Sequence, residues 1–113
     1  MFNIFDNYCP VKLCLMDFGT KIKNERENHK MLLREVAAIV KMDTALLSKI
    51  ERNKRMATRE QVNLFIKLFN LDKQEITNLW LGQKIAYSLI DEETPFQILK
   101  VAESAIQYLK QVH

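Results

Sequence analysis

The chain carries few side chains of the kinds that perform covalent or metal chemistry. Its only cysteines are Cys9 and Cys14, and its only histidines, His29 and His113, lie far from them in the sequence. Because a structural zinc site needs several such ligands at short spacings, no metal centre is expected. No nucleophile stands beside a base, and no glycine-rich phosphate loop is visible. The sequence therefore argues against an enzyme, and no cofactor or small-molecule ligand is indicated.

Positive charge is concentrated in one block of the chain. Residues 20–60 hold eleven Lys or Arg against six Asp or Glu, whereas residues 1–19 and 61–113 each carry a net charge of −1. A confined basic surplus is typical of nucleic-acid contact, although an ordinary solvated helical face would show the same pattern. The net charge of the whole chain is only +3, so this inference depends on the distribution of charge.

The composition indicates a helical, non-membrane protein. Hydrophobic residues make up 48% of the 113 residues, and only two glycines and two prolines occur. A chain of this length can bury an adequate core, and no uncharged apolar window is long enough to cross a bilayer. No secretion signal precedes Met16. We therefore expect a cytoplasmic protein with reduced thiols.

Apolar residues at helical spacing, separated by helix-start residues, predict six helices. Asp43 is expected to cap a helix that begins at Thr44, and Thr58 with Gln61 forms a capping box. A similar box opens the fifth helix at Asp72, and the last begins at the pair Thr94-Pro95. The expected helices cover about residues 18–28, 33–40, 44–53, 59–69, 72–89 and 95–112.

The second and third expected helices have the spacing of a helix-turn-helix. Lys41-Met42-Asp43 joins them, and the small residues Ala37 and Ala38 allow a close crossing. Here the sequence resembles the Cro and phage-repressor type of helix-turn-helix regulators, the XRE family, over about residues 18–71. The matching stretches are residues 18–26, 33–37 and, most specifically, 47–55, which read Leu-Ser-Lys-Ile-Glu-Arg-Asn-Lys-Arg.

This resemblance implies an all-α fold, a repressor-like helix-turn-helix bundle of five helices plus an additional C-terminal helix. It also implies a sequence-specific regulator that places the helix 44–53 in the major groove of double-stranded DNA. Residues 16–71 would be the DNA-binding domain and residues 72–113 a dimerisation region. Residues 1–15 lack caps and helical periodicity, so we expect a weakly ordered extension there or, alternatively, a strand that pairs with a second copy.

Three positions depart from the family pattern. Leu32 stands where Ser or Thr usually caps the second helix, so this helix start should be weaker. Lys41 replaces the turn glycine and is expected to adopt a left-handed backbone at a cost of about 1 kcal/mol. Asn53 replaces the glycine that commonly ends the third helix, and asparagine tolerates the same conformation.

The resemblance also assigns roles to individual residues. Arg26 and Glu51 would form a structural ion pair between the first and third helices, the alternative being two solvated charges. The base-contacting positions would be Thr44, Ala45, Ser48 and Lys49. Phosphates would be held by basic residues, of which some could prove to be plain surface charges: Arg34, Arg52, Lys54, Arg55 and Arg59.

The last helix carries an apolar stripe with little left to cover, and helix-turn-helix repressors of this size usually bind two-fold sites as dimers. The expected homodimer interface comprises Trp80, Leu81, Phe96, Leu99, Ala102, Ile106 and Leu109. The last helix could instead fold back on Trp80 and Leu81 of its own chain. An alternative function is that of an antitoxin or control protein whose C-terminal helices bind a partner protein and whose DNA binding is autoregulatory.

Overall fold

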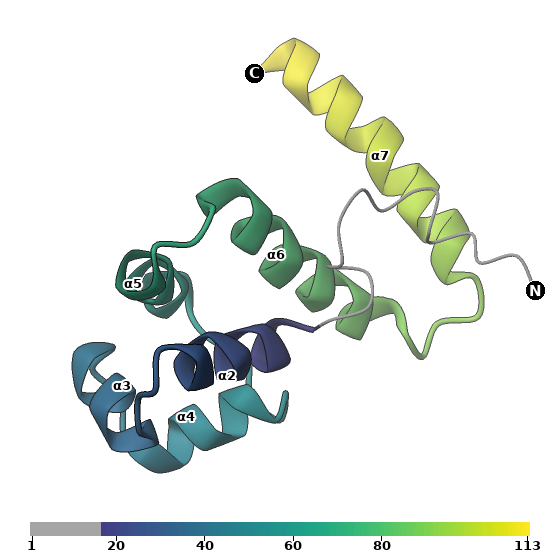
Figure 1. Ribbon diagram of the computed structural model, residues 1–113. Helices are drawn as coiled ribbons and strands as arrows, with labels where there is room; N and C mark the ends of the chain where they lie inside the picture. The colour runs from purple at the N-terminus through teal and green to yellow at the C-terminus, as the bar shows by residue number, and fades with distance from the viewer. Residues whose placement is uncertain (1–16) are drawn as a thin grey trace, which may run out of the picture. The chain divides into compact units, whose positions relative to one another are not determined.

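A computed structural model describes residues 17–113, which form six helices and contain no strand, as the sequence predicts. The predictions for residues 1–15 lie outside this range. The helices are α2 (Phe18–Asn28), α3 (Leu33–Ile39), α4 (Thr44–Glu51), α5 (Arg59–Phe69), α6 (Lys73–Leu89) and α7 (Pro95–Val112) (Figure 1). The chain divides into two compact units, and the boundary falls inside α6 between Gln83 and Lys84. The first unit thus extends beyond residue 72, because Ile76 and Trp80 are buried in its core.

Most of the helix starts use the residues that the sequence indicates. The Asp43 carboxylate accepts a hydrogen bond from the Leu46 amide at 2.6 Å. Thr58 and Gln61 exchange two hydrogen bonds, of 3.2 and 2.9 Å, which completes the capping box of α5. Such bonds satisfy amides that the first turn of a helix leaves unpaired.

Two helix starts lack a side-chain cap on their first turn. The side chain of Leu32 makes no capping bond, as expected, but Glu35 compensates in part because its carboxylate accepts the Leu32 amide at 2.7 Å. Thr94 occupies the N-cap position of α7, as predicted, but its side chain makes no capping hydrogen bond. Pro95 nevertheless occupies the first helical position, where its missing N–H is no loss.

Four helices are followed, within two residues of their ends, by a residue with a left-handed backbone, and none of the four residues is glycine. They are Lys30, Lys41, Asn53 and Asn70, with φ between 53° and 60°. In each case the next amide donates back to a carbonyl of the last turn, as in the 2.9 Å bond from Lys54 to Lys49. The expected conformations of Lys41 and Asn53 are confirmed. The turns begin earlier than predicted, so that α3 ends at Ile39 and α4 at Glu51.

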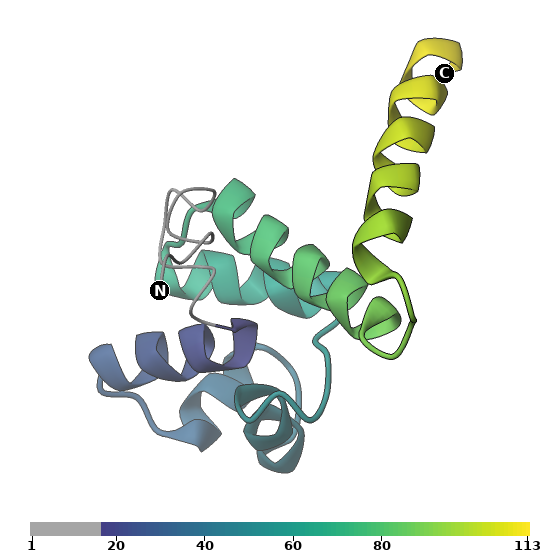
Figure 2. The same cartoon turned by 90° about the vertical axis from the view of Figure 1, so that its right-hand side faces the viewer.

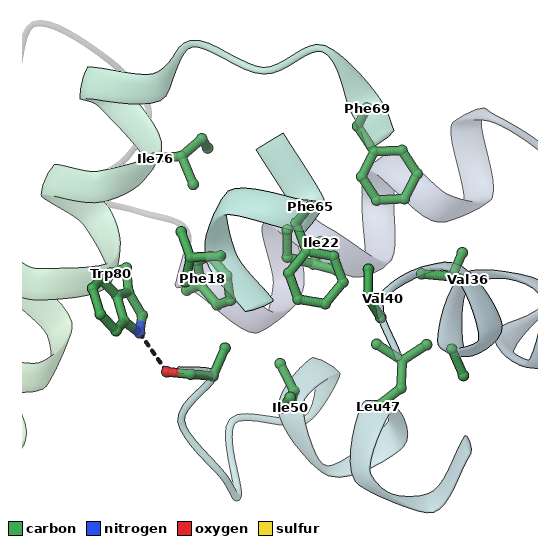
Figure 3. Packing of buried hydrophobic residues seen from close by; sticks show 13 residues of the cluster. Phe18, Ile22, Val36, Val40, Leu47, Ile50, Phe65, Phe69, Ile76 and Trp80 are labelled. Carbon is green, nitrogen blue, oxygen red and sulfur yellow. Dashed lines mark hydrogen bonds between the residues drawn. The ribbon is translucent and has the colours of Figure 1, made fainter. Parts of the chain in front are cut away.

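The core of the first unit is built around α2, which lies between α5 and α4 in both views (Figures 1 and 2) and contacts both helices. Phe18 of α2 meets Phe65 of α5 edge to face, with ring centroids 6.1 Å apart. Side chains from five helices converge on this pair (Figure 3) and are buried; among them are Ile22, Val36, Val40, Leu47, Ile50, Phe69, Ile76 and Trp80. This shared core fixes the first five helices relative to one another up to Gln83.

Gly19 permits the closest approach between α2 and the end of α4. A Cβ atom at this position would collide with the Ile50 carbonyl oxygen and lie 2.8 Å from both the Glu51 carbonyl oxygen and the Asn53 side-chain oxygen. Two of these atoms belong to the backbone and cannot rotate away. Gly82, by contrast, has no atom within 4 Å of such a Cβ.

We expect opposite effects from replacing the two glycines with alanine. Gly19→Ala should lower the free energy of unfolding by about 2 kcal/mol or more, because α2 must move away from α4. Gly82→Ala should raise it by up to about 1 kcal/mol, the helix propensity that alanine adds at an unobstructed position. Urea unfolding of both variants provides the measurement. Equal changes would contradict the close approach at Gly19.

Candidate nucleic-acid interface

The helix α4 has one face in the core and one in solvent. Leu47 and Ile50 are 0% and 1% exposed and anchor the helix to the first unit. The predicted base-contacting residues lie elsewhere on the helix: Thr44, Ala45 and Lys49 are exposed, and Ser48 is half-buried. Asp43 caps the first turn of α4, whose residues Thr44 and Ala45 lie at the surface. The four side chains are therefore available at the surface of one helix.

The five predicted phosphate-contacting residues are all exposed, but two of them also make contacts within the chain. The Arg52 Nε donates to the Ser48 carbonyl at 3.2 Å, so this guanidinium lies along α4. The Arg59 guanidinium lies over the Trp80 ring, 5.2 Å from its centroid. Arg34 lies on α3, whereas Lys54 and Arg55 lie in the loop between α4 and α5. The basic residues thus flank α4 on both sides in the sequence.

Arg26 and Glu51 are joined by two hydrogen bonds. The Nε and Nη2 atoms of Arg26 lie 2.8 and 3.1 Å from the two Glu51 carboxylate oxygens, and Nη1 donates to the Met31 carbonyl at 3.0 Å. Glu51 is only 6% exposed. Its hydrogen bonds to Arg26 raise the pKa of the guanidinium above its ordinary value, against the opposing effect of burial. The pair connects α2 to the end of α4 inside a largely water-excluded site.

A second polar cluster surrounds Asn53, at the end of α4. Its side-chain oxygen accepts from the Gly19 amide at 3.1 Å and from the Gln83 amide group at 3.0 Å. The Gln83 side-chain oxygen in turn accepts from the Phe18 amide at 2.8 Å. The sequence reasoning missed Gln83, since a hydrogen bond between residues 30 positions apart leaves no local pattern in the sequence.

Asp17 completes the start of α2 beside this cluster. Its carboxylate accepts the Thr20 amide at 2.7 Å. Burial raises the pKa of the Asp17 carboxyl, but hydrogen bonds from Thr20 and Asn53 outweigh it and hold the pKa below its ordinary value. The ionised form is therefore the one that caps α2.

The predicted dimer interface needs one correction. Trp80 is only 4% exposed, and its indole N–H donates to the Ala57 carbonyl at 2.9 Å (Figure 3), so it belongs to the core of the first unit and has little surface to offer a partner. Leu81 is half-buried and packs against that same core. The other five residues, Phe96, Leu99, Ala102, Ile106 and Leu109, lie on α7, in which no residue is buried.

Over residues 17–113, no group of His, Cys, Asp or Glu side chains is arranged to hold a metal ion. Within the same range, no helix combines the length and apolar character needed to span a membrane.

Two short helices joined by a tight turn, with the second seated on a core by its inner face, define a helix-turn-helix domain. The comparison with protein families agrees: residues 22–76 match a family model described as helix-turn-helix. This match, which covers slightly less than half of the chain, supports an XRE/Cro-type helix-turn-helix segment and a DNA-binding transcriptional regulator. Comparisons with curated proteins and with solved structures gave no significant match.

A double-mutant cycle on Arg26 and Glu51 tests the energetic importance of the ion pair. Glu51→Ala or Arg26→Ala alone should destabilise by about 3 kcal/mol, because each strands a charge in a poorly hydrated site. The double variant should be less destabilised than the sum of the two. The more exposed pair of Lys21 and Glu25, at 3.1 Å, is the control, and its coupling should stay below about 0.5 kcal/mol. Similar coupling energies for both pairs would contradict this interpretation.

Proposed function

We propose that this regulator recognises a specific DNA sequence by placing α4 in the major groove. The observation that carries the proposal is the division of α4 into a buried face of Leu47 and Ile50 and an accessible side with Thr44, Ala45 and Lys49. An α-helix fits the major groove, where each base pair presents a distinct pattern of donors, acceptors and methyl groups. A helix held by its inner face can enter the groove without unfolding the domain.

The chemistry of the accessible residues favours particular contacts. Thr44 and Ala45 offer methyl groups suited to the thymine methyl, and Lys49 can donate to the O6 and N7 atoms of guanine. Ser48 can bond to several base edges or to a phosphate. None of the four is Asn or Gln, the residues that bind adenine through two hydrogen bonds. Part of the specificity therefore rests on DNA shape, with Arg34, Arg52, Lys54, Arg55 and Arg59 at phosphates.

We further propose that the protein binds a two-fold operator as a homodimer. The support comes from α7, where Phe96, Leu99, Ala102, Ile106 and Leu109 form the apolar stripe and all five are exposed. A two-fold dimer would place two copies of α4 on half-sites about 34 Å apart, one turn of DNA. DNA binding requires access to the operator, and we propose the cytoplasm as that compartment.

Separate substitutions distinguish base contacts from phosphate contacts. Lys49→Ala should cost about 1–3 kcal/mol on the best site and relax discrimination at one guanine position, because a base-edge contact disappears. Lys54→Ala or Arg55→Ala should weaken all sequences about equally and lower the slope of log affinity against log salt by about one unit. A site selected from random duplexes and a scrambled duplex, titrated at several salt concentrations, provide the measurement. An unchanged ratio of specific to non-specific affinity in Lys49→Ala would refute the placement of α4.

The dimer is tested by Leu99→Glu in the full chain. A charge in an apolar interface should convert dimers to monomers, as measured by sedimentation, since an unpaired buried charge is costly. Gln107→Glu, on the polar side of α7, serves as the matched control and should leave the dimer intact. A wild-type protein that is monomeric at tens of micromolar would exclude the homodimer. A monomer would instead favour the alternative function, in which α7 binds a partner protein, as in an antitoxin or control protein.

A further inference from the structure

The loop between α4 and α5 is fixed at both ends by the same helix. Asn53 precedes Lys54-Arg55-Met56, and its side-chain oxygen accepts a hydrogen bond from Gln83 at 3.0 Å. Ala57 follows them, and its carbonyl accepts the indole N–H of Trp80 at 2.9 Å. Trp80 and Gln83 are three residues apart on α6 and so project from the same side of that helix.

One attachment is buried and the other is partly buried. Ala57 and Trp80 are each 4% exposed, so their hydrogen bond is buried. Asn53 and Gln83 are half-buried, and Asn53 also accepts the amide of Gly19 at 3.1 Å. Water competes less for hydrogen bonds that are buried or partly buried, so both attachments should hold their geometry better than fully exposed ones, the Trp80 bond most of all. The two basic side chains between them, Lys54 and Arg55, are exposed.

Trp80 also contacts a third basic residue. The Arg59 guanidinium lies 5.2 Å from the centroid of the Trp80 ring, within the range of a cation–π interaction. Arg59 is the first residue of α5, directly after the Thr58 cap. One indole group therefore holds the end of the basic loop with its N–H and orients Arg59 with its ring.

The geometry points to Trp80 and Gln83 as positioning residues that hold the basic loop 54–56 in the shape needed to contact DNA phosphates. Neither residue touches DNA in this scheme. Both act through Lys54 and Arg55, and Trp80 acts through Arg59 as well. The inference rests on the phosphate role proposed above for these basic residues. Its physical basis is preorganisation: a loop ordered before binding loses less conformational entropy when it meets the phosphates.

The first experiment uses the full chain with Gln83→Ala, and Gln74→Ala as a matched control. Gln74 is an exposed glutamine on the same helix, and its amide group donates to Asn78 at 2.8 Å. In the absence of DNA, nitrogen-15 relaxation should show larger motions of the amides of residues 54–56 in Gln83→Ala only. Unchanged order in this loop would overturn the inference.

Binding by the same two variants is measured on the selected duplex and on the scrambled duplex over a range of salt concentrations. Gln83→Ala should weaken both complexes by a similar factor, about two- to tenfold, the range of a single net hydrogen bond. It should also lower the salt slope, since phosphate contacts are lost. A lowered ratio of specific to non-specific affinity would show instead that Gln83 acts through α4, and would overturn the inference.

A cycle with Lys54→Ala separates positioning from general stability. If Gln83 acts through the loop, its removal should have a smaller effect on DNA affinity once Lys54 is absent. Full additivity would overturn the inference. Trp80→Phe, which keeps an aromatic ring but lacks the N–H donor, should reproduce the weakening seen with Gln83→Ala.

Failure of the underlying function has a different signature. Lys54→Ala and Arg55→Ala, each in the otherwise native chain, could leave the slope of log DNA affinity against log salt unchanged. The phosphate role of the loop would then be wrong, and so would the proposal that Trp80 and Gln83 position the loop for phosphate contact. The relaxation measurement would still decide whether Gln83 orders the loop. The two failures are thus distinguishable.

Discussion

The carboxyl end of α4 is the point on which the geometry of the first unit depends. Glu51 is buried there against Arg26, and Gly19 allows the backbone of α2 to approach the last carbonyls of α4. Asn53 adds hydrogen bonds to α2 and α6 directly afterwards. A short helix has little stability of its own, so its direction is set by such tertiary contacts. The buried ion pair contributes orientation more than stability, because removing two charges from water offsets much of their attraction.

The opposite end of α4 is held by packing of Met42 and Leu46 against the core and by local bonds. Asp43 caps its first turn, and Lys41 reverses the chain with a left-handed backbone. In the proposed complex, the amino-terminal turn of α4 would meet DNA while polar contacts hold its carboxyl end in place. The polar contacts of Trp80 and Gln83 extend the fixed region into the basic loop beyond α4. The unit thus combines a rigid base with an accessible helix start.

Local chemistry made much of this predictable. The apolar spacing of Val62, Phe65 and Phe69 located α5, and the pair Thr58 and Gln61 marked its start, because capping and helical periodicity are encoded within a few residues. Contacts between distant residues were predictable only through the family resemblance, as for Arg26 and Glu51. The roles of Gln83 and Trp80 were missed, since a side-chain hydrogen bond across 30 or 23 residues leaves no local pattern. Thr94 had the right residue type for a cap but not the backbone conformation.

The left-handed turns have a consequence for how fast the protein finds its target. Lys30 and Lys41 occupy conformations in which glycine would be more stable by up to about 1 kcal/mol, yet each adds a positive charge to the basic block. Charges at a protein surface attract an oppositely charged partner over distances of about 10 Å at ordinary ionic strength and accelerate encounter. At these two positions, the chain keeps some backbone strain and gains positive charge, which would speed its encounter with nucleic acid if the proposed DNA binding holds.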